Sequence, residues 1–456
     1  MSRRRVLGLL GGAAALGVLG ACSDDGPERE RPRPPRSVPD PAGFVRTRWA
    51  EDPWARGAYS YLPVEATPAL REALAEPVEG WIHLAGEAVS TDAPATVHGA
   101  RRSGAAAAGA VLDARDEGGT VVVVGAGAAG AAAARVLADA GVDVVVVEAR
   151  DRTGGRIATT GPDGWPVPVE LGASFVHDVD ASDSAELLAG LGVAAEPFGY
   201  ATAYLGPDDR PLAEGDDAYA SGFAALEEAI AWAEERDDDV SLAEALDRSG
   251  AGDDADPDGL ALARRSEVEV ELGVATADLS TWWGLDEGTS GDDLVVVGGY
   301  GTLVDTDLDG IDVRLGWPVA TVDHTADRIT VTSVDGRTLE TDQLVVTVPL
   351  ALLAAGAVVF DPPLPEAHRA AVAGLGTGLL DKVWLRWDEP WWTEEAEVWS
   401  SVDGPFEWCN LHPATGEAVL LAFVGATAAR EWTSRPDDEL RAAALADLSR
   451  FRAAGW

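Results

Sequence analysis

The chain contains very little lysine. Of its 34 lysine and arginine residues, only Lys382 is a lysine, so arginine carries almost all of the positive charge. Positive charge is itself scarce, because 78 aspartate and glutamate residues give a formal net charge of -44. Proteins that bind nucleic acid need basic stripes on their surface, so this balance argues against nucleic acid as a partner. An acidic exterior can attract cationic substrates, or it can reflect a general acidic, lysine-poor style of the organism's proteins.

Cysteine is also rare. The chain has 2 cysteines, Cys22 and Cys409, which excludes a disulfide framework and a cysteine-rich metal centre. We expect Cys409 to be a lone thiol in the core, and we predict no metal site. The composition is otherwise that of a globular protein, with 46% hydrophobic and 25% charged residues, and 456 residues allow two domains with sizeable cores.

The first 22 residues have the pattern of an export signal. The segment begins "MSRRRVLGLL", continues as a run of small apolar residues and ends in "LGAC" at Cys22. The run is too short and glycine-rich to favour a membrane-spanning helix, and an uncleaved hydrophobic anchor is the alternative. Arg3 and Arg4 resemble a twin-arginine signal, and the end resembles a bacterial lipobox in which Cys22 would be lipidated. We therefore expect export, with lipid anchoring to the outer face of the bacterial cell membrane or secretion. Residues 23–45 are charged and proline-rich, which predicts a disordered tether.

A dinucleotide-binding pattern spans residues 120–150. The segment "TVVVVGAGAAGAAAARVLADAGVDVVVVEAR" contains a valine-rich strand, a GxGxxG motif directly after it, an alanine-rich helix and a second valine-rich strand that ends at Glu148. A GxGxxG motif between strand and helix, with an acidic residue after the second strand, is a specific signal. The segment therefore predicts an α/β fold with a Rossmann-like dinucleotide-binding domain.

Each glycine of the motif has a physical reason. Gly125 permits the tight turn, Gly127 lets the backbone approach a pyrophosphate, and Gly130 lets the helix pack closely on the strand. The start of the helix, which includes Ala129, presents unpaired N–H groups to the phosphates. Glu148 is expected to accept hydrogen bonds from the ribose hydroxyls.

The residues that follow resemble the flavin amine oxidase family, which includes monoamine oxidases, polyamine oxidases, histone demethylases and L-amino acid oxidases. The stretch "EARDRTGGRIATT" has the family's acid, arginine and Gly-Gly-Arg, and "VELGASFVH" resembles the segment that passes the isoalloxazine ring. Later stretches such as "DGRTLETDQLVVTVPLALL" follow in the family's order, and the resemblance covers residues 119–456. It implies FAD as the cofactor, with contacts from Arg150, Gly155, Arg156, Gly172, Ala173 and the backbone of Val319.

A segment that resembles the family's C-terminal portion stands near the beginning of this chain. Residues 46–113 contain "HLAGEA" and "TVHGARRSG", which resemble the end of the family's FAD-binding domain. The chain is therefore similar to a circularly permuted member of the family, and Glu87, Thr96 and Val97 are implied FAD contacts. Ala58 stands where monoamine oxidases carry the cysteine that links the flavin, which implies non-covalent FAD.

The permuted order predicts how the first segment joins the fold. A strand at 81–85 and a helix at 97–112 would lead into the strand that begins at Thr120, as a right-handed crossover between parallel strands. The fold class is thus α/β, with an inserted α+β substrate domain. The expected division is a signal at 1–22, a linker at 23–45, a permuted FAD-binding segment at 46–118, a dinucleotide-binding core at 119–180, a first part of the substrate domain at 181–290, a continued FAD-binding domain at 291–360 and a second part of the substrate domain at 361–456.

The single lysine stands in "DKVWLRW", which resembles a strand of the family. In the family a lysine at this place holds a water against flavin N5, and the resemblance implies this role for Lys382. An ammonium suits the role, because its three rotatable donors can hold a water and stabilise the negative charge that develops on O₂. We expect the neighbouring Asp381 to be solvated.

Two further residues are candidates on the substrate side. Tyr59 matches the first of two tyrosines that form the aromatic cage of monoamine oxidases, whereas the second position falls on Thr96. His177 falls where polyamine oxidases carry a histidine near the flavin, and it could accept a proton from the substrate amine or serve a structural role. Asp178 follows it where the family usually has glycine.

The resemblance implies FAD-dependent oxidation of an amine by hydride transfer to flavin N5, with reoxidation by O₂ that gives H₂O₂. The substrate would be a small polyamine- or monoamine-type molecule, and the acidic exterior weakly favours the former. Three alternatives stay open. One is an L-amino acid oxidase, which needs an arginine over the flavin where this chain has "FVHDVD". The second is an exported flavoprotein without oxidase activity, and the third is a desaturase that acts on hydrophobic substrates and has a similar FAD domain. Neither the particular amine nor the oligomeric state follows from the sequence.

Overall fold

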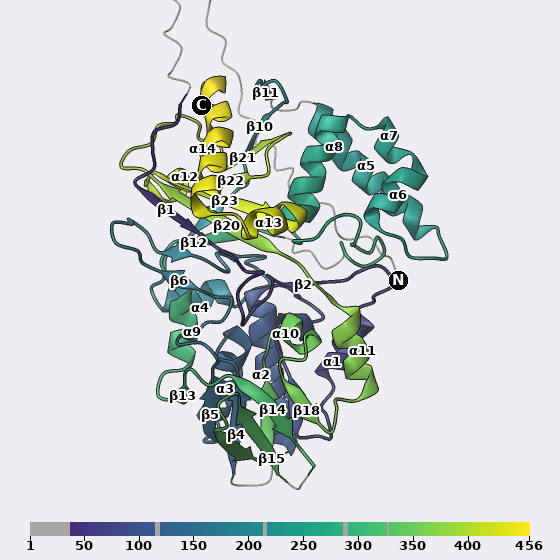
Figure 1. The fold of residues 1–456 in the computed structure, drawn as a ribbon, viewed down its shortest axis with the longest axis vertical. Helices are drawn as coiled ribbons and strands as arrows, with labels where there is room; N and C mark the ends of the chain where they lie inside the picture. Colours follow the sequence, from purple (N-terminus) through teal and green to yellow (C-terminus); the bar gives the residue numbers. More distant parts are fainter. Residues whose placement is uncertain (1–36, 115–118, 213–216, 286–290, 326–327) are drawn as a thin grey trace, which may run out of the picture.

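The computed structural model describes residues 37–114, 119–212, 217–285, 291–325 and 328–456, so the predicted signal and most of the predicted tether lie outside the described residues. The chain forms two lobes stacked along its long axis (Figure 1). In that view the lower lobe contains a parallel sheet with helices, and the upper lobe contains a mostly antiparallel sheet with helices around it. None of the described helices is long and apolar enough to cross a membrane.

A five-stranded parallel sheet forms the centre of the lower lobe. Its order is β13 (Asp312–Arg314), β5 (Asp143–Val147), β4 (Thr120–Val124), β17 (Gln343–Val346) and β3 (Ile82–Leu84). The valine runs fit this place, because parallel strands are covered on both faces. One face packs against the alanine-rich helices α2 (Val97–Ala114) and α3 (Ala128–Asp139) in a single core.

The first segment of the chain completes this sheet. β3 pairs in parallel with β17, with Ile82 opposite Leu344 and Leu84 opposite Val346. From β3 the chain runs through α2 to β4, and β17 lies between these two strands in the sheet. The predicted strand at 81–85 and helix at 97–112 are therefore both present, in a strand–helix–strand unit whose strands are parallel.

A smaller sheet packs on the other face. Its order is β16 (Thr338–Thr341), β15 (Ile329–Ser333), β14 (Val319–Asp323) and β18 (Val359–Asp361). Val322 and Val331 of this sheet share a core with Val122 and Val124 of β4. The dinucleotide-type sheet is thus buried on both sides.

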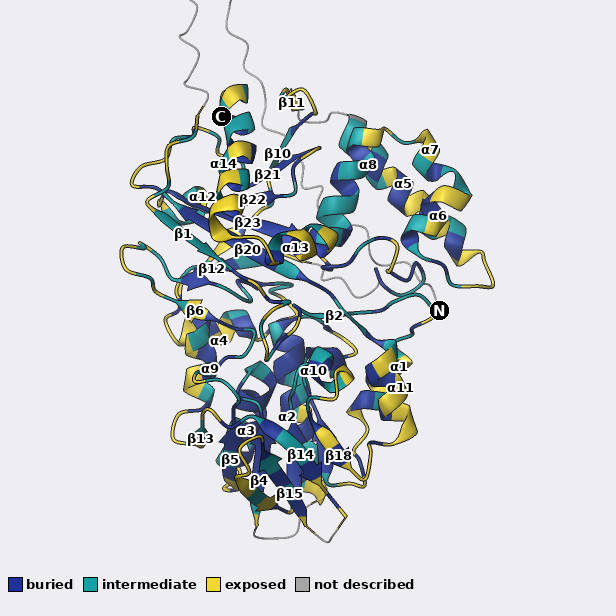
Figure 2. Cartoon of the chain, viewed as in Figure 1, coloured by how far each residue is buried: buried dark blue, intermediate teal, exposed yellow. Residues whose placement is uncertain are grey.

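The upper lobe is built on a seven-stranded sheet. Its order is β1 (Gly43–Arg46), β20 (Leu380–Arg386), β23 (Val419–Gly425), β22 (Glu407–Asn410), β21 (Val398–Ser401), β10 (Thr202–Leu205) and β11 (Pro211–Leu212). One face packs on α14 (Asp437–Ala454) through a tryptophan-rich core. Figure 2 shows strands β20, β21, β22 and β23 as mostly buried, the edge strand β1 as intermediate and the outer faces of the surrounding helices as exposed.

The predicted tether is too long at its C-terminal end. Residues Gly43–Arg46 form the edge strand β1, in which Gly43 lies opposite Arg386 and Arg46 opposite Val383 of β20. The apolar pair Phe44 and Val45 is too short a pattern to predict a strand. The strand forms because it pairs with β20, which supplies its hydrogen bonds, and this pairing cannot be predicted from two apolar residues. Residues 43–45 therefore do not belong to a disordered tether, in contrast to the prediction.

A helical part adjoins the upper sheet. It consists of α5 (Asp217–Glu234), α6 (Leu242–Ser249), α7 (Ala251–Asp254), α8 (Pro257–Arg264) and the π-helix η2 (Arg265–Val270). The Ser241 side chain caps α6 by accepting from the Glu244 N–H, and the Asp256 side chain caps α8 by accepting from the Asp258 and Gly259 N–H groups. The last helix then passes directly into the π-helical turn.

Short elements connect the two lobes and complete the fold. They are β2 (Ser60–Tyr61), β19 (Gly376–Thr377), β6 (Thr159–Thr160), β7 (Val169–Glu170), β8 (Phe175–Val176), β9 (Ala195–Phe198), β12 (Asp293–Val296), α1 (Ala69–Ala75), η1 (Glu87–Val89), α4 (Ser184–Gly190), α9 (Gly301–Asp307), α10 (Leu350–Ala354), α11 (Glu366–Gly374), α12 (His412–Thr415) and α13 (Ala426–Thr433).

Candidate active site

One large cavity is lined by both lobes and has a volume of about 2300 Å³. This volume exceeds the roughly 300–1,000 Å³ of ordinary small-molecule sites, so the cavity has room for a dinucleotide and a second ligand. All predicted site residues except Gly130 line it. They are Tyr59, Glu87, Thr96, Val97, Gly125, Gly127, Ala129, Glu148, Arg150, Gly155, Arg156, Gly172, Ala173, His177, Val319 and Lys382.

The nucleotide end of the cavity is formed by the glycine motif. Gly125 has a φ of +104°, which favours glycine. A Cβ added at Gly130 would lie 1.9 Å from the Gly125 carbonyl oxygen, so this glycine lies at a close contact outside the cavity. A Cβ added at Gly127 would meet nothing closer than the Gly154 carbonyl oxygen at 3.7 Å. The backbone at Gly127, directly before α3, is therefore open toward the cavity and accessible to an anionic group.

The acidic residue after the second strand holds the motif in place. The Glu148 carboxylate accepts from the Ala126 N–H at 2.9 Å and from the Arg150 N–H at 2.8 Å. The side chain is 6% exposed and faces the cavity. Glu148 thus fixes the relative positions of the glycine turn and of Arg150.

Two ion pairs connect the first segment of the chain to the dinucleotide motif. Arg150 donates to both oxygens of Asp52, at 2.7 Å each. Arg156 donates to Glu87 at 2.8 Å and to the Ala58 carbonyl oxygen at 2.6 Å. Segments far apart in sequence therefore form one wall of the cavity.

The Glu87 carboxylate is fully engaged by protein groups. Besides Arg156 it accepts from the Ser60 hydroxyl at 2.6 Å, the Ser60 N–H at 3.2 Å and the Ala95 N–H at 3.2 Å. Burial would raise its pKa, but the charges of Arg156 and Arg71 outweigh burial and lower the pKa below its usual value. Glu87 is thus ionised, and its hydrogen bonds hold Arg156 and Ser60 in position at the cavity.

Lys382 lies at the other end of the same wall, in β20, and is 4% exposed. Its ammonium donates to the Ser174 hydroxyl at 2.6 Å, to the Glu170 carbonyl oxygen at 3.3 Å and to the Gly172 carbonyl oxygen. These contacts hold the backbone of residues 170–174, on which Gly172 and Ala173 face the cavity. Burial lowers the pKa of Lys382 to about 7, which the charge of Glu170 partly opposes.

His177 lies beside two residues that the sequence did not single out. Its Nδ1 is 2.7 Å from Asp293 Oδ2, and the Tyr200 hydroxyl donates to the same oxygen at 2.6 Å. The imidazole stacks on Phe175, with 5.8 Å between ring centroids, and lines the cavity. The following residue, Asp178, has a φ of 50°, so the loop keeps a conformation that glycine adopts readily.

Tyr59 faces the cavity with its ring but binds protein through its hydroxyl, which donates to the carbonyl oxygens of Val270 at 3.1 Å and Glu271 at 2.9 Å. Thr96 donates to the Ala93 carbonyl oxygen at 2.9 Å and accepts from the Gly99 N–H at 2.9 Å, so its hydroxyl caps the start of α2. An aromatic cluster beside His177 lines the cavity instead, and it consists of residues that the sequence did not indicate: Phe175, Phe198, Tyr200 and Phe423.

The prediction for Asp381 was wrong. This carboxylate is 5% exposed and accepts from the Thr47 hydroxyl at 2.7 Å, the Trp49 N–H at 2.9 Å and the Thr433 hydroxyl at 2.7 Å. Its side chain points away from Lys382 because neighbours along a strand face opposite sides. Cys409 is buried as predicted, at the cavity wall in β22.

Residues 30–112 and 128–455 match the family model of flavin-containing amine oxidoreductases. The chain belongs to this family. It is 28% identical to polyamine oxidase 2 of Arabidopsis thaliana over 386 residues, which cover 77% of this chain and 76% of that protein. It is 30% identical to polyamine oxidase 3 of Oryza sativa subsp. japonica over 346 residues, or 66% of this chain and 67% of that protein. A structure of putrescine oxidase bound to putrescine has the same fold, with a TM-score of 0.60, 24% identity and coverage of 74% of this chain and 83% of that one.

This flavin-containing amine oxidoreductase uses FAD, and the lining residues fit that cofactor. The open backbone at Gly127 and the start of α3 suit a pyrophosphate, and the Glu148 carboxylate suits ribose hydroxyls. Arg150 and Arg156, each held in place by a carboxylate, present guanidinium groups along the cavity wall. At the opposite end the cavity is lined by residues 171–174, whose segment Lys382 holds through its hydrogen bonds.

We expect Asp293→Asn to shift the pH dependence of kcat/KM in this amine oxidoreductase. Burial alone would lower the pKa of His177, but the hydrogen bond and charge of Asp293 outweigh burial and raise it. The ion pair between His177 and Asp293 therefore stabilises the folded state. The stabilisation is complete below a pH of about 6.5, the pKa of a histidine in the unfolded chain, and it is lost as the pH rises through the raised pKa of His177 in the folded state. An asparagine removes the charge, so the limb that His177 contributes should move to lower pH.

The measurement is a pH profile of kcat/KM for the wild type, Asp293→Asn and the neighbouring Asp292→Asn, whose carboxylate has no hydrogen bond to His177 within the described ranges. The limb should move only in Asp293→Asn. A uniform drop in kcat/KM with an unmoved limb would show that Asp293 has only a structural role.

Proposed function

We propose that this enzyme oxidises a polyamine- or monoamine-type substrate at the end of the cavity beside Lys382 and passes the electrons to O₂, which gives H₂O₂. Bound FAD supplies the redox chemistry, because its N5 accepts a hydride equivalent from the carbon next to the amine nitrogen. The observation that carries the proposal is the position of Lys382: the chain's one lysine is buried in the wall of the cavity that the glycine motif opens into. The polyamine oxidases among its relatives support this substrate type.

The protein's own part is to bind, desolvate and orient the amine. Phe175 and Phe423 give the cavity an apolar surface, which keeps water away from a neutral amine. His177, held by Asp293, has its imidazole at the cavity and takes up a proton from the amine nitrogen. The three donors of the Lys382 ammonium go to Ser174, Glu170 and Gly172, and its positive charge stabilises the negative charge that develops on O₂.

The cofactor is held without a covalent bond in this proposal. Ala58, at the position that carries a linking cysteine in monoamine oxidases, has no nucleophile, and its carbonyl oxygen accepts from Arg156 instead. Denaturation with acid should therefore release all yellow colour into the supernatant.

The segment order is part of the same proposal. Residues 46–118 act as the family's C-terminal FAD-binding segment placed before its N-terminal one, with the remaining division of the chain as predicted from the sequence. The support is that β3 and α2 from this segment join the sheet of β4, and that Asp52 and Glu87 pair with Arg150 and Arg156.

The location of the protein is proposed from the sequence alone. The pattern at 1–22 supports twin-arginine export of the folded, FAD-loaded protein and lipid attachment through Cys22 at the outer face of the bacterial cell membrane, or secretion. Replacing Cys22 with serine should move the protein from the membrane fraction to the soluble fraction of the source organism.

The test is a visible spectrum of the purified protein, followed by a peroxide assay with putrescine, spermidine, tyramine and L-leucine. We expect a flavin spectrum and peroxide release with one or more of the three amines. Peroxide from L-leucine alone would identify an L-amino acid oxidase. A flavin that is reoxidised slowly in air after photoreduction, with no peroxide from any substrate, would identify a flavoprotein without oxidase activity and reject the proposal.

A further inference from the structure

The hairpin of β10 and β11 forms the edge of the upper sheet that is farthest from Lys382. Tyr204 of β10 lies opposite Leu212 of β11, and both residues line the large cavity. β11 is two residues long and pairs with β10 alone among the described strands. The hairpin is therefore a wall of the cavity that few bonds of the sheet hold in place.

The register of the sheet gives the distance of this wall from Lys382. One row of residues, each opposite the next, crosses the sheet: Lys382, Phe423, Glu407, Ser400 and Tyr204. Because neighbouring strands are about 4.8 Å apart, Tyr204 stands roughly 19 Å from Lys382 along this row. A short amine that binds beside Lys382 does not reach the hairpin, whereas a long amine does.

The surface of this end wall is largely apolar and aromatic. Tyr204 stacks on Tyr219 of α5, with 4.9 Å between the ring centroids. Leu212 lines the cavity next to Tyr204 in the hairpin, and Phe223 lines it one helical turn after Tyr219. Hydrocarbon groups that leave water for such a surface gain free energy. The wall therefore suits the far end of a long, slim amine.

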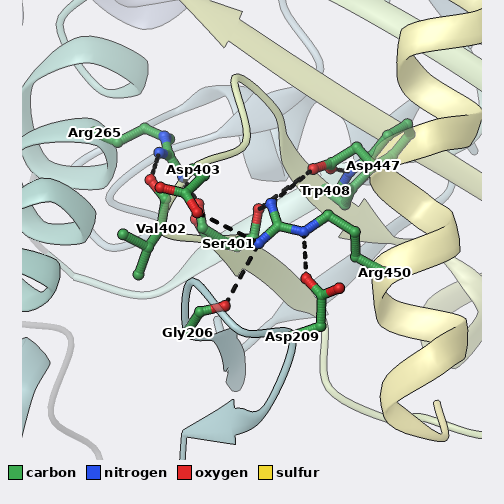
Figure 3. Close-up of polar contacts among 10 residues, drawn as sticks. Gly206, Asp209, Arg265, Ser401, Val402, Asp403, Trp408, Asp447 and Arg450 are labelled. Carbon is green, nitrogen blue, oxygen red and sulfur yellow. Dashed lines mark hydrogen bonds and ion pairs between the residues drawn. The ribbon is translucent and has the colours of Figure 1, made fainter.

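Arg450 of α14 fastens the turn of the hairpin from outside the cavity (Figure 3). Its Nε donates to Asp209 at 2.6 Å, and its Nη2 donates to the Gly206 carbonyl oxygen at 3.5 Å. The same guanidinium donates to the Ser401 hydroxyl at 3.2 Å and lies 3.8 Å from Asp447. Arg450 thus connects the turn of the hairpin to the end of β21 and to its own helix.

The groups behind Arg450 are themselves held in place. Asp447 is buried on the same helix and accepts from the Trp408 indole N–H at 2.8 Å. Arg265, at the start of η2, donates to the Val402 carbonyl oxygen at 2.8 Å and so holds the end of β21 from the other side. The hairpin turn is therefore attached through Arg450 to a part of the lobe that is fixed by several elements.

We propose that Arg450 is a positioning residue, which holds the hairpin of β10 and β11 as the end wall of the cavity and thereby sets the affinity for long amines. The inference rests on the proposed function, because it assumes that amines bind beside Lys382. Without Arg450 the hairpin moves more freely, and a long amine must then order the wall at the cost of affinity. A short amine does not touch the wall, so its binding is unaffected.

The first measurement is hydrogen exchange of the purified protein, followed by mass spectrometry of peptides that cover residues 202–212. The Gly206 and Asp209 N–H groups are hydrogen bonded within the turn. We expect them to exchange about fivefold or more faster in Arg450→Met than in the wild type, since a partly buried ion pair contributes a modest free energy. Asp208→Asn is the matched control, because it removes a carboxylate of the same turn whose ion pair is with Arg210. Its exchange should be that of the wild type.

The second measurement compares butylamine and decylamine as competitive inhibitors of the oxidation of whichever amine the wild type turns over. Each has one amine group, and they differ only in length. The wild type should bind decylamine at least about tenfold more tightly, because the additional methylene groups are buried against the wall. In Arg450→Met the inhibition constant of decylamine should rise about fivefold, while that of butylamine and the kcat stay within about twofold. Asp208→Asn should leave all three values unchanged.

Each result supports or overturns the proposal. Equal exchange in the wild type and Arg450→Met overturns it, as does an equal loss of affinity for both inhibitors or a wild type that binds them equally well. If Arg450→Met does not fold, Asp209→Asn takes its place in both measurements, since it removes the same ion pair from a partly exposed side chain. Absence of FAD or of peroxide with every amine would instead reject the proposed function, and the exchange rates would still decide whether Arg450 holds the hairpin.

Discussion

Replacing Gly127 with valine should abolish FAD binding while the chain remains folded. At Gly127 a Cβ meets no protein atom within 3.7 Å, so the added side chain fits the empty loop and extends into the cavity. A branched side chain there occupies the space in which a pyrophosphate must approach the backbone N–H groups at the start of α3. The purified variant should therefore be colourless, with a far-ultraviolet circular dichroism spectrum like that of the wild type.

Two other glycine variants separate binding from folding. Gly161→Val places the same side chain in a loop where nothing lies within 4 Å, so this variant should remain yellow. Gly130→Ala brings a Cβ to 1.9 Å from the Gly125 carbonyl oxygen, so this variant should lose thermal stability as well as FAD. A yellow Gly127→Val with the wild-type FAD content would mean that the cofactor does not lie against this turn.

Replacing Lys382 with methionine should leave FAD bound and slow its reoxidation by O₂ by about tenfold or more. Methionine has nearly the volume and shape of the lysine stem, so the apolar packing in β20 is kept. It removes the ammonium, which donates to the Ser174 hydroxyl and to the carbonyl oxygens of Glu170 and Gly172. Without the ammonium, the variant lacks the group that we propose stabilises the negative charge on O₂.

The pH dependence gives a second signature. Burial lowers the pKa of Lys382 to about 7, so in the wild type the ammonium is lost as pH rises through that value. If the charged form is the active one, the reoxidation rate should fall over the same range, and the limb should be missing in Lys382→Met. Stopped-flow absorbance after anaerobic reduction measures both effects, and Arg386→Met, on the same strand outside the cavity, should behave as the wild type. Unchanged reoxidation in Lys382→Met would remove the role assigned to this lysine.

The dinucleotide end could be predicted from the sequence because its signals are local. A valine strand, three glycines at fixed spacing and an acid after the second strand define a backbone shape within 31 residues of "TVVVVGAGAAGAAAARVLADAGVDVVVVEAR". The same is true of Lys382, which stands out as the one lysine of the chain. These residues line one cavity, together with Glu87 from the first segment.

The substrate end could not be predicted in the same way, because its signals depend on pairing between distant strands. Asp293 and Asp209 are two of 78 acidic residues, and no local pattern marks them. Tyr204 comes into line with Lys382 only through the register of β20, β23, β22, β21 and β10. The prediction that Asp381 is solvated failed because two of its partners, Thr47 and Trp49, lie near the beginning of the chain, far from it in the sequence.

The most direct test of the account is the visible absorbance of the purified protein during anaerobic addition of putrescine. We expect a stoichiometric flavin spectrum that is bleached by the diamine and restored by air. A colourless protein, or a flavin spectrum that neither putrescine nor any other amine bleaches, would contradict it.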